Sequence, residues 1–318
     1  MLTHGFALDQ NGRKMSKSLG NTVDPLKILQ ESGADILRLW VASTDYFEDV
    51  RIGKEVLATT TDAYRKLRNT FRYLLGALAD YSESEWVEPS EMPELERWVL
   101  HRLAELDHEL REAADNFEFN RYTRLLASFA NDDLSAFFFD IRKDSLYCDA
   151  PESAKRRAYR TVLDIVFHAL VRWLDPVLCF TTEEVWGTRY PDAGSVHLLE
   201  WPVIDADWRD EALANRWSLI RHTRVQVTES IEPLRREKVI GSSLEAKVLM
   251  PELEADLADL DLADLAEIYI VSQVIPGESD QVEVSKSDYE KCGRCWRLLP
   301  EVTDAGGLCG RCDGVVNG

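Results

Sequence analysis

The feature that most constrains the fold of this chain is a series of stripes in which large apolar residues recur every three or four positions. Four long stripes run through residues 57–78, 95–110, 122–141 and 159–174. This period places the apolar side chains along one face of an α-helix, and short polar segments separate one stripe from the next. The pattern therefore predicts a bundle of long amphipathic helices.

Composition narrows the class of protein. Apolar residues make up 45% and charged residues 30% of the 318 residues, which is typical of a folded, core-forming chain. The sequence has no run of uninterrupted apolar residues long enough to span a membrane. The first five residues have neither the basic start nor the apolar segment of a secretory signal. We therefore expect a cytoplasmic protein without a membrane-spanning helix.

Charge is unevenly distributed along the chain. The formal net charge of −20 argues against indiscriminate coating of nucleic acid. Residues 216–247 nevertheless carry seven bases against four acids, whereas residues 251–270 carry seven acids and no base. The acidic total thus leaves room for local basic patches that dock on a polyanion.

The segments outside the stripes are predicted to contain both strands and helices. Residues 2–9 are typical of a strand, and no partner strand is expected nearby. A short helix is predicted to begin at Pro25, with Asp24 as its N-cap. Past Pro202 we expect a small α/β module. Its predicted elements are a helix at 216–238, a strand at 246–250, an acidic helix at 252–266, and β-rich stretches at 268–274 and 281–285.

Four of the six cysteines form two Cys-x-x-Cys pairs. Cys292 and Cys295 are followed, after thirteen residues, by Cys309 and Cys312. Two such turns facing each other make a tetrahedral all-sulfur site that suits zinc, and four protein ligands make that metal structural. The alternatives are unrelated cysteines or a redox pair. The remaining cysteines, predicted to be buried on apolar helices without chemistry, are Cys148 and Cys179.

A second motif, Lys14-Met15-Ser16-Lys17-Ser18, lies between Gly12 and Gly20. Two lysines three residues apart on a glycine-hinged loop present two mobile ammonium charges, which suit a polyphosphate. Composition alone would also allow an ordinary basic surface loop. The complete five-residue match favours the polyphosphate interpretation.

Residues 12–21 resemble the signature loop of the class I aminoacyl-tRNA synthetases. Further segments are similar to the isoleucine branch and its close relatives, namely residues 33–43, 137–144, 182–186, 240–246 and the four-cysteine tail with Trp296. The resemblance covers essentially all 318 residues and corresponds to the C-terminal part of the bacterial isoleucine enzymes. The presence of both the signature loop and the four-cysteine tail distinguishes the isoleucine enzymes from the related branches that the chain resembles.

This resemblance implies an isoleucine–tRNA ligase that uses ATP with magnesium and acts as a monomer on isoleucine and tRNA(Ile). By resemblance, Lys17 binds the ATP phosphates and stabilises the leaving pyrophosphate, Lys14 assists, and Met15, Ser16 and Ser18 complete the nucleotide-binding loop. The His-x-x-His signature of the family and its editing domain do not occur in these residues. We therefore expect no activity from the chain alone. The alternative is a non-catalytic tRNA-binding module.

The resemblance also indicates where tRNA would bind. Candidate backbone contacts, each alternatively a solvated helix face, are Arg221, Arg224, Arg235, Arg236 and Lys238. Trp296 is either a base-stacking platform or a residue packed over the metal. The histidines show no metal or triad spacing.

The predicted fold class is mainly α, a helical anticodon-binding bundle with smaller parts on either side. The expected division is the end of a Rossmann-type catalytic domain (1–45), the anticodon-binding bundle (46–208), a small α/β module (209–284) and a zinc-binding tail (285–318).

Overall fold

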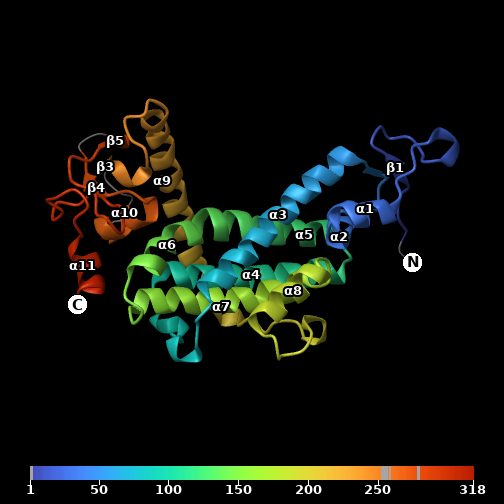
Figure 1. Ribbon diagram of the computed structural model, residues 1–318, viewed down its shortest axis with the longest axis horizontal. Helices are drawn as coiled ribbons and strands as arrows, with labels where there is room; N and C mark the ends of the chain where they lie inside the picture. Colours follow the sequence, from blue (N-terminus) through green and yellow to red (C-terminus); the bar gives the residue numbers. More distant parts are fainter. Residues whose placement is uncertain (1–2, 252–256, 258, 278–279) are drawn as a thin grey trace. The chain divides into compact units, whose positions relative to one another are not determined.

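The computed structural model describes residues 3–251, 257, 259–277 and 280–318. Figure 1 labels its helices and strands in chain order. The chain divides into two compact units. The first contains Met1–Trp86, Val99–Phe138 and Arg160–Arg209, and the second contains Val87–Trp98, Phe139–Tyr159 and Asp210–Gly318. The four-part division expected from the sequence stays a prediction.

The first unit begins with a two-stranded parallel sheet. Strand β1 (Ala7–Asp9) pairs with β2 (Val50–Ile52), with Leu8 opposite Arg51. The prediction for residues 2–9 was therefore wrong in two respects. The described residues 3–6 are not in a strand, and β1 has a partner, which is a three-residue strand too short to show a periodic pattern. Helices α1 (Pro25–Ser32) and α2 (Ala34–Ser43) connect the strands, and Asp24 caps α1 as predicted.

The helical pattern is confirmed. The long helices are α3 (Lys54–Ala77), α4 (Glu94–Asp115), α5 (Phe119–Ser128), a π-helix (Phe129–Phe138), α6 (Phe139–Cys148), α7 (Ala154–Leu174) and α8 (Cys179–Arg189). Large apolar residues from the predicted stripes, such as Phe71, Leu103 and Leu170, are almost fully buried. Their burial removes apolar surface from water and stabilises the fold. The fold is mainly helical, as the stripes predict.

The second unit includes a small α/β part. Helix α9 (Glu211–Arg236) leads into β3 (Ala246–Met250), the central strand of a three-stranded sheet. Strand β4 (Gln273–Pro276) pairs parallel to β3, and β5 (Glu283–Lys286) pairs antiparallel. The strand predicted at 246–250 is confirmed.

Other element boundaries in this part differ from those predicted from the sequence. Helix α10 (Leu262–Tyr269) is capped by Asp261, whose side chain accepts a hydrogen bond from the Ala263 N–H. Residues 252–256 and 258 of the predicted acidic helix lie outside the described residues. The β prediction for 268–272 was wrong, because α10 continues through Tyr269 and strand pairing starts only at Gln273.

The remaining elements are short. Helix α11 (Gly310–Val316) follows the second cysteine pair. The 3-10 helices that lie wholly within the described residues are Lys17–Leu19, Glu83–Glu85, Pro89–Glu91, Val196–Leu198, Ala206–Trp208 and Ser243–Glu245. Among the described residues, no helix has the length and apolar character needed to cross a bilayer.

Candidate functional site

The signature loop is built around the carboxylate of Asp9, the last residue of β1. Its Oδ1 accepts hydrogen bonds from the N–H groups of Asn11 (2.9 Å) and Arg13 (2.9 Å). Its Oδ2 accepts one from Asn21 Nδ2 (2.9 Å) and one from Arg13 Nε (3.0 Å). These bonds, with that from Asn21 foremost, lower the pKa of Asp9 to about 2. The carboxylate thus stays ionised and holds together the start and the end of the signature loop.

Asn21 connects the two ends of the loop. Its Oδ1 accepts the N–H of Ser16 (2.9 Å), and its Nδ2 also donates to the backbone oxygen of Lys14 (3.2 Å). Ser16 in turn caps the 3-10 helix by accepting the N–H of Leu19 (3.3 Å). Asp9 and Asn21 therefore shape the loop, and neither was predicted from the sequence to have a role. The tendency of Asp and Asn to bond backbone N–H groups in turns is the signal that points to them.

Both lysines of the motif are exposed, and within the described residues neither is paired with a carboxylate. Lys14 Nζ lies 5.9 Å from the centre of the Phe6 ring. Met15 is half-buried and packs on the apolar cluster that contains Trp40 and Ile52. The loop thus has an apolar anchor and two accessible ammonium groups, an arrangement that can bind a polyphosphate.

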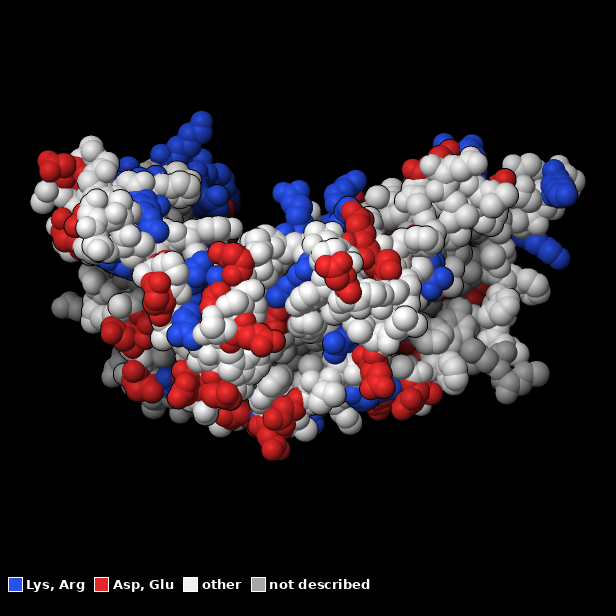
Figure 2. Space-filling view, turned by 60° about the horizontal axis from the view of Figure 1, so that its bottom comes forward, with Lys and Arg blue, Asp and Glu red and all other residues white. Residues whose placement is uncertain are grey.

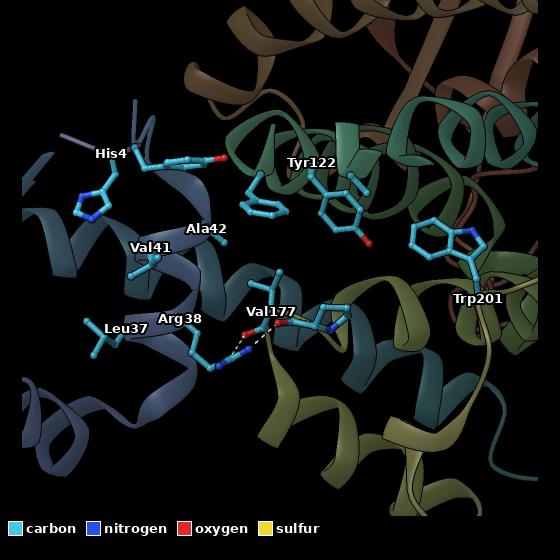
Figure 3. Close-up of a pocket in the computed structure, with 12 residues that line it drawn as sticks. His4, Leu37, Arg38, Val41, Ala42, Tyr122, Val177 and Trp201 are labelled. Carbon is cyan, nitrogen blue, oxygen red and sulfur yellow. Dashed lines mark hydrogen bonds between the residues drawn. The ribbon is translucent and has the colours of Figure 1, made fainter. Parts of the chain in front are cut away.

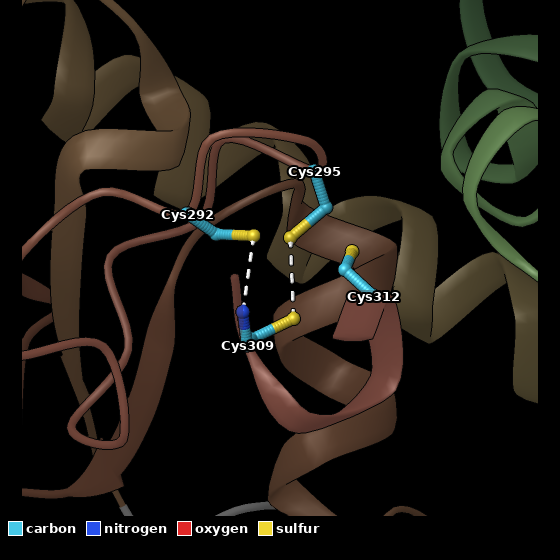
Figure 4. A group of neighbouring side chains, drawn as sticks. All are labelled: Cys292, Cys295, Cys309 and Cys312. Carbon is cyan, nitrogen blue, oxygen red and sulfur yellow. Dashed lines mark hydrogen bonds between the residues drawn. The ribbon is translucent and has the colours of Figure 1, made fainter. Parts of the chain in front are cut away.

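The four cysteines of the two pairs converge (Figure 4). Their sulfur atoms lie within 4.8 Å of one another, and all four residues are buried. Cys295 Sγ lies 3.8 Å from Cys309 Sγ, and the Cys309 N–H donates to Cys292 Sγ (3.3 Å). Four buried sulfur atoms at this spacing can hold a metal ion in tetrahedral coordination, and they fill every ligand position.

Close backbone contacts shape the turns that carry these cysteines. Gly293 donates its N–H to Gly307 O (2.9 Å), and a Cβ at Gly293 would come 2.7 Å from Gly306 O, so the turn requires glycine. Burial raises the pKa of Cys292, but hydrogen bonds from nearby N–H groups outweigh it and lower that pKa to about 6. A thiol with such a pKa is readily deprotonated for metal binding.

The cysteine centre packs against α6 within the second unit. Cys148 belongs to the same buried cluster as the four cysteines, and burial raises its pKa to about 11. Arg294 donates to the backbone oxygens of Cys148 (2.5 Å) and Tyr147 (3.0 Å). Arg311 pairs with Asp144 (2.7 Å). Cys148 is buried as predicted but is part of the centre's packing.

Cys179 differs from its prediction. It is only half-buried, and its Sγ lies 3.9 Å from Asp35 Oδ1. The expected full burial was wrong, because the residue lies in the first turn of α8 rather than in the helix interior.

Trp296 directly follows the first cysteine pair and is largely exposed. Its side chain is 59% exposed, and its backbone adopts a left-handed conformation (φ 67°), which is uncommon for a bulky residue. Lys291 Nζ lies 5.7 Å from its ring centre. An exposed, fixed indole beside a cation is suited to stacking on a nucleic-acid base.

The five basic candidates on and after α9 fall into two groups. Arg235, Arg236 and Lys238 are exposed, and Arg235 is paired with Glu232 (2.9 Å). In Figure 2, Lys and Arg side chains gather over the end of α9. The half-buried members of the set are Arg221, whose guanidinium lies 5.2 Å from the Trp98 ring centre, and Arg224, which bonds Ile268 O (3.0 Å) and Asp140 (3.2 Å).

The pocket in Figure 3 lies in the first unit and has a volume of about 750 Å³. Two of its polar side chains, Arg38 and Tyr122, bond to backbone oxygens. Arg38 donates to Pro176 O (2.6 Å) and Val177 O (3.1 Å), and the Tyr122 hydroxyl donates to Trp173 O (2.7 Å). The pocket is therefore a mostly apolar hollow, in which Arg38 and Tyr122 bond to the backbone and His4 is exposed at its lining.

The comparisons with known proteins agree with this geometry. Residues 96–250 match the family described as the anticodon-binding domain of tRNA ligase, and residues 1–53 match class I tRNA synthetases (I, L, M and V). An isoleucine–tRNA ligase of Zymomonas mobilis subsp. mobilis is 59% identical over 99% of this chain and 34% of its own length. That of Agrobacterium fabrum is 51% identical over 95% of this chain and 33% of its own length. The chain spans about a third of the length of these curated relatives.

A solved structure supports the fold. The crystal structure of the ternary complex of Agrobacterium radiobacter K84 agnB2 LeuRS-tRNA-LeuAMS matches with a TM-score of 0.53 at 23% identity. The match covers 65% of this chain and 24% of that chain. At this identity the likeness concerns the fold alone.

Proposed function

The chain belongs to the class I aminoacyl-tRNA synthetases and corresponds to the C-terminal part of isoleucine–tRNA ligases, and from this premise we propose that it supplies the signature loop and the tRNA-recognising part of such a ligase. The observation that carries the proposal is the presence, in one chain, of the preorganised lysine loop and the buried four-cysteine cluster. The proposed setting is the cytoplasm, where thiolates bind metal rather than pair as disulfides. The proposed assembly state is a monomer.

The loop acts on ATP with magnesium. Lys17 contacts the phosphates and stabilises the charge that develops on the leaving pyrophosphate, with Lys14 beside it. Ser16 and Ser18, whose Oγ atoms are 3.1 Å apart, hold the loop backbone, and Met15 anchors it. The nucleotide and isoleucine need further groups to hold them, so the lysines contribute to adenylate formation only beside such groups.

The proposed metal is one structural zinc held by Cys292, Cys295, Cys309 and Cys312. Bound zinc would cross-link the two turns, whose buried cluster also contains Val302 and Cys148. The absence of an open ligand position fits a structural role.

The proposed RNA partner is tRNA(Ile). Arg235, Arg236 and Lys238 would neutralise backbone phosphates, and Trp296 would stack on an unpaired base. Arg221 and Arg224 are weaker candidates, because both are half-buried and Arg224 already bonds Asp140. Desolvation lowers the pKa of Arg224, which is the opposite of what phosphate binding favours.

The test is isoleucine-dependent ATP–pyrophosphate exchange together with tRNA binding. We expect tRNA binding but no exchange from the purified chain, and exchange when the N-terminal part of an isoleucine–tRNA ligase is added. Failure of that addition to restore exchange, with tRNA binding intact, would instead favour a non-catalytic tRNA-binding module. Loss of both would overturn the proposal.

A further inference from the structure

A second concave surface in the first unit has a different character from the apolar pocket. This basic hollow, with a volume of about 620 Å³, is lined by residues of α2, α3 and α5 and by Arg51 of β2. Arg51 and Arg124 are its charged members. Among the described residues, no Asp or Glu lines it. Such a lining is notable in a chain with 57 acidic and 37 basic residues.

The two arginines of the basic hollow are available to a ligand. Both are exposed, and neither has a carboxylate partner in the described parts of the chain. Neighbouring arginines on α3 differ, since Arg65 pairs with Asp62 (2.7 Å) and Arg68 with Glu184 (3.0 Å). Two uncompensated guanidinium groups in one concave surface are suited to phosphate.

The hydroxyl groups of the basic hollow act as acceptors. Thr59 donates to Glu55 O (3.2 Å), Thr60 to Val56 O (3.0 Å) and Ser43 to Trp40 O (3.2 Å). Each hydroxyl therefore donates its single hydrogen to a backbone oxygen, and its oxygen can still accept a hydrogen bond from a ligand. A ligand that brings its own hydroxyl groups satisfies them.

Arg51 also connects the basic hollow to the signature loop. A Cβ at Gly12, which has φ +76°, would lie 3.4 Å from Arg51 Nη2, so the guanidinium rests against the turn that precedes Lys14. A ligand held by Arg51 would therefore lie next to the loop.

We propose that the basic hollow binds the ribose–phosphate backbone of RNA, with Arg51 and Arg124 on phosphates and the threonine oxygens accepting from ribose 2′-hydroxyls. The guanidinium groups alone would suit any phosphate, whereas the row of acceptors favours RNA over DNA and over free phosphate. This inference rests on the proposed tRNA binding and adds a site that is separate from α9 and Trp296.

The test measures anisotropy binding of the full, zinc-loaded chain to a labelled tRNA transcript between about 50 and 200 mM salt. The Arg51→Gln/Arg124→Gln variant is expected to weaken binding about a hundredfold, since a hydrogen bond to a charged group is worth roughly tenfold or more. The slope of log affinity against log salt should fall by about two. The matched control is Arg65→Gln/Arg72→Gln, which removes the same charge from α3 outside the hollow and should change affinity little.

A second arm tests the sugar. A hairpin of RNA is compared with DNA of the same sequence, and Thr59→Val is expected to reduce the RNA preference several-fold, while circular dichroism confirms an unchanged fold. Inorganic phosphate at constant ionic strength should not displace the RNA. Equal losses in the two arginine variants, or displacement by phosphate without RNA preference, would overturn the inference alone. No RNA binding by the intact chain would overturn the proposed function together with it.

Discussion

The signature loop and the cysteine centre place their reactive groups in opposite ways. The lysines of the loop are exposed, and hydrogen bonds of the Asp9 and Asn21 side chains hold the loop backbone in place. The centre buries its cysteines and brings all their sulfur atoms within 4.8 Å. A buried set of four ligands is complete once the metal binds, whereas an exposed pair of cations needs a ligand held by other groups. The difference supports the proposal that the cysteine centre needs no further protein group to hold a metal, whereas the lysine loop acts only beside other groups that hold the nucleotide.

The largest expected effect is loss of the metal. Cys309→Ser should abolish zinc binding and unfold residues 292–316, because structural zinc contributes about 10 kcal/mol or more to such sites. The buried cluster of the four cysteines also contains Cys148, so the tail shares its packing with α6. Cys148 and the partners of Arg294 and Arg311 lie on or directly after α6, so the C-terminal turn of α6 should loosen as well. Elemental analysis and amide hydrogen exchange measure the two effects.

The matched control is Cys179→Ser, which lies outside the centre and should keep one zinc per chain. Metal-replete wild-type protein with well below one zinc would contradict the assignment of the centre. Protected amides in α6 after metal loss would contradict its coupling to the tail.

The next effect concerns the loop. In enzyme completed by an N-terminal part, Lys17→Ala should lower the rate of adenylate formation on the order of a hundredfold, with little change in isoleucine binding, because its charge is needed mainly as pyrophosphate leaves. Lys27→Ala is the control, since Lys27 is an exposed lysine of α1 that pairs with Glu31. Pyrophosphate exchange that is insensitive to Lys17 would show that the loop is an ordinary basic surface.

A smaller effect is expected on α9. Arg235→Glu/Arg236→Glu should weaken all tRNAs about equally, roughly tenfold to a hundredfold, and reduce the salt slope. Arg65→Glu/Arg72→Glu carries the same charge change on α3 and serves as the control. A selective loss for one tRNA would assign base recognition rather than phosphate contact to these arginines.

The smallest effect is a pH dependence of loop order. Because the pKa of Asp9 is lowered from 3.8 to about 2 in the folded state, its stabilising effect is present above about pH 3.8 and is lost as the pH falls through 2. The side-chain amide of Asn21 should therefore keep its bonded NMR shift at pH 4 and lose it near pH 2. Asp9→Asn should show the loosened loop at every pH. A wild-type transition near pH 4 would mean that the carboxylate is not held as described.

The sequence was most informative where a pattern is local. Apolar periodicity predicted the long helices, and the spacing of Cys292, Cys295, Cys309 and Cys312 predicted their convergence. Contacts between distant segments were missed. The pairing of β1 with β2 joins residues more than forty positions apart, and Cys148 meets a tail nearly 150 residues further on. No periodic signal marks such contacts, because they depend on how the helices place the segments in space.

The same limit applied to the site. The lysines could be found from their motif, but the roles of Asp9 and Asn21 depend on side-chain bonds inside the loop. The left-handed backbone of Trp296 is likewise not predicted by its neighbours in the sequence.

Equilibrium binding of the intact, zinc-loaded chain to isoleucine and valine tRNAs at physiological salt tests most directly whether this chain recognises an anticodon. Screening limits the field of the −20 charge to roughly 8 Å, so local cations can still engage RNA. We expect tighter binding to the isoleucine tRNA, and loss of that preference in Trp296→Ala with most of the affinity retained. Equal affinity of the intact chain for the two tRNAs would contradict anticodon recognition.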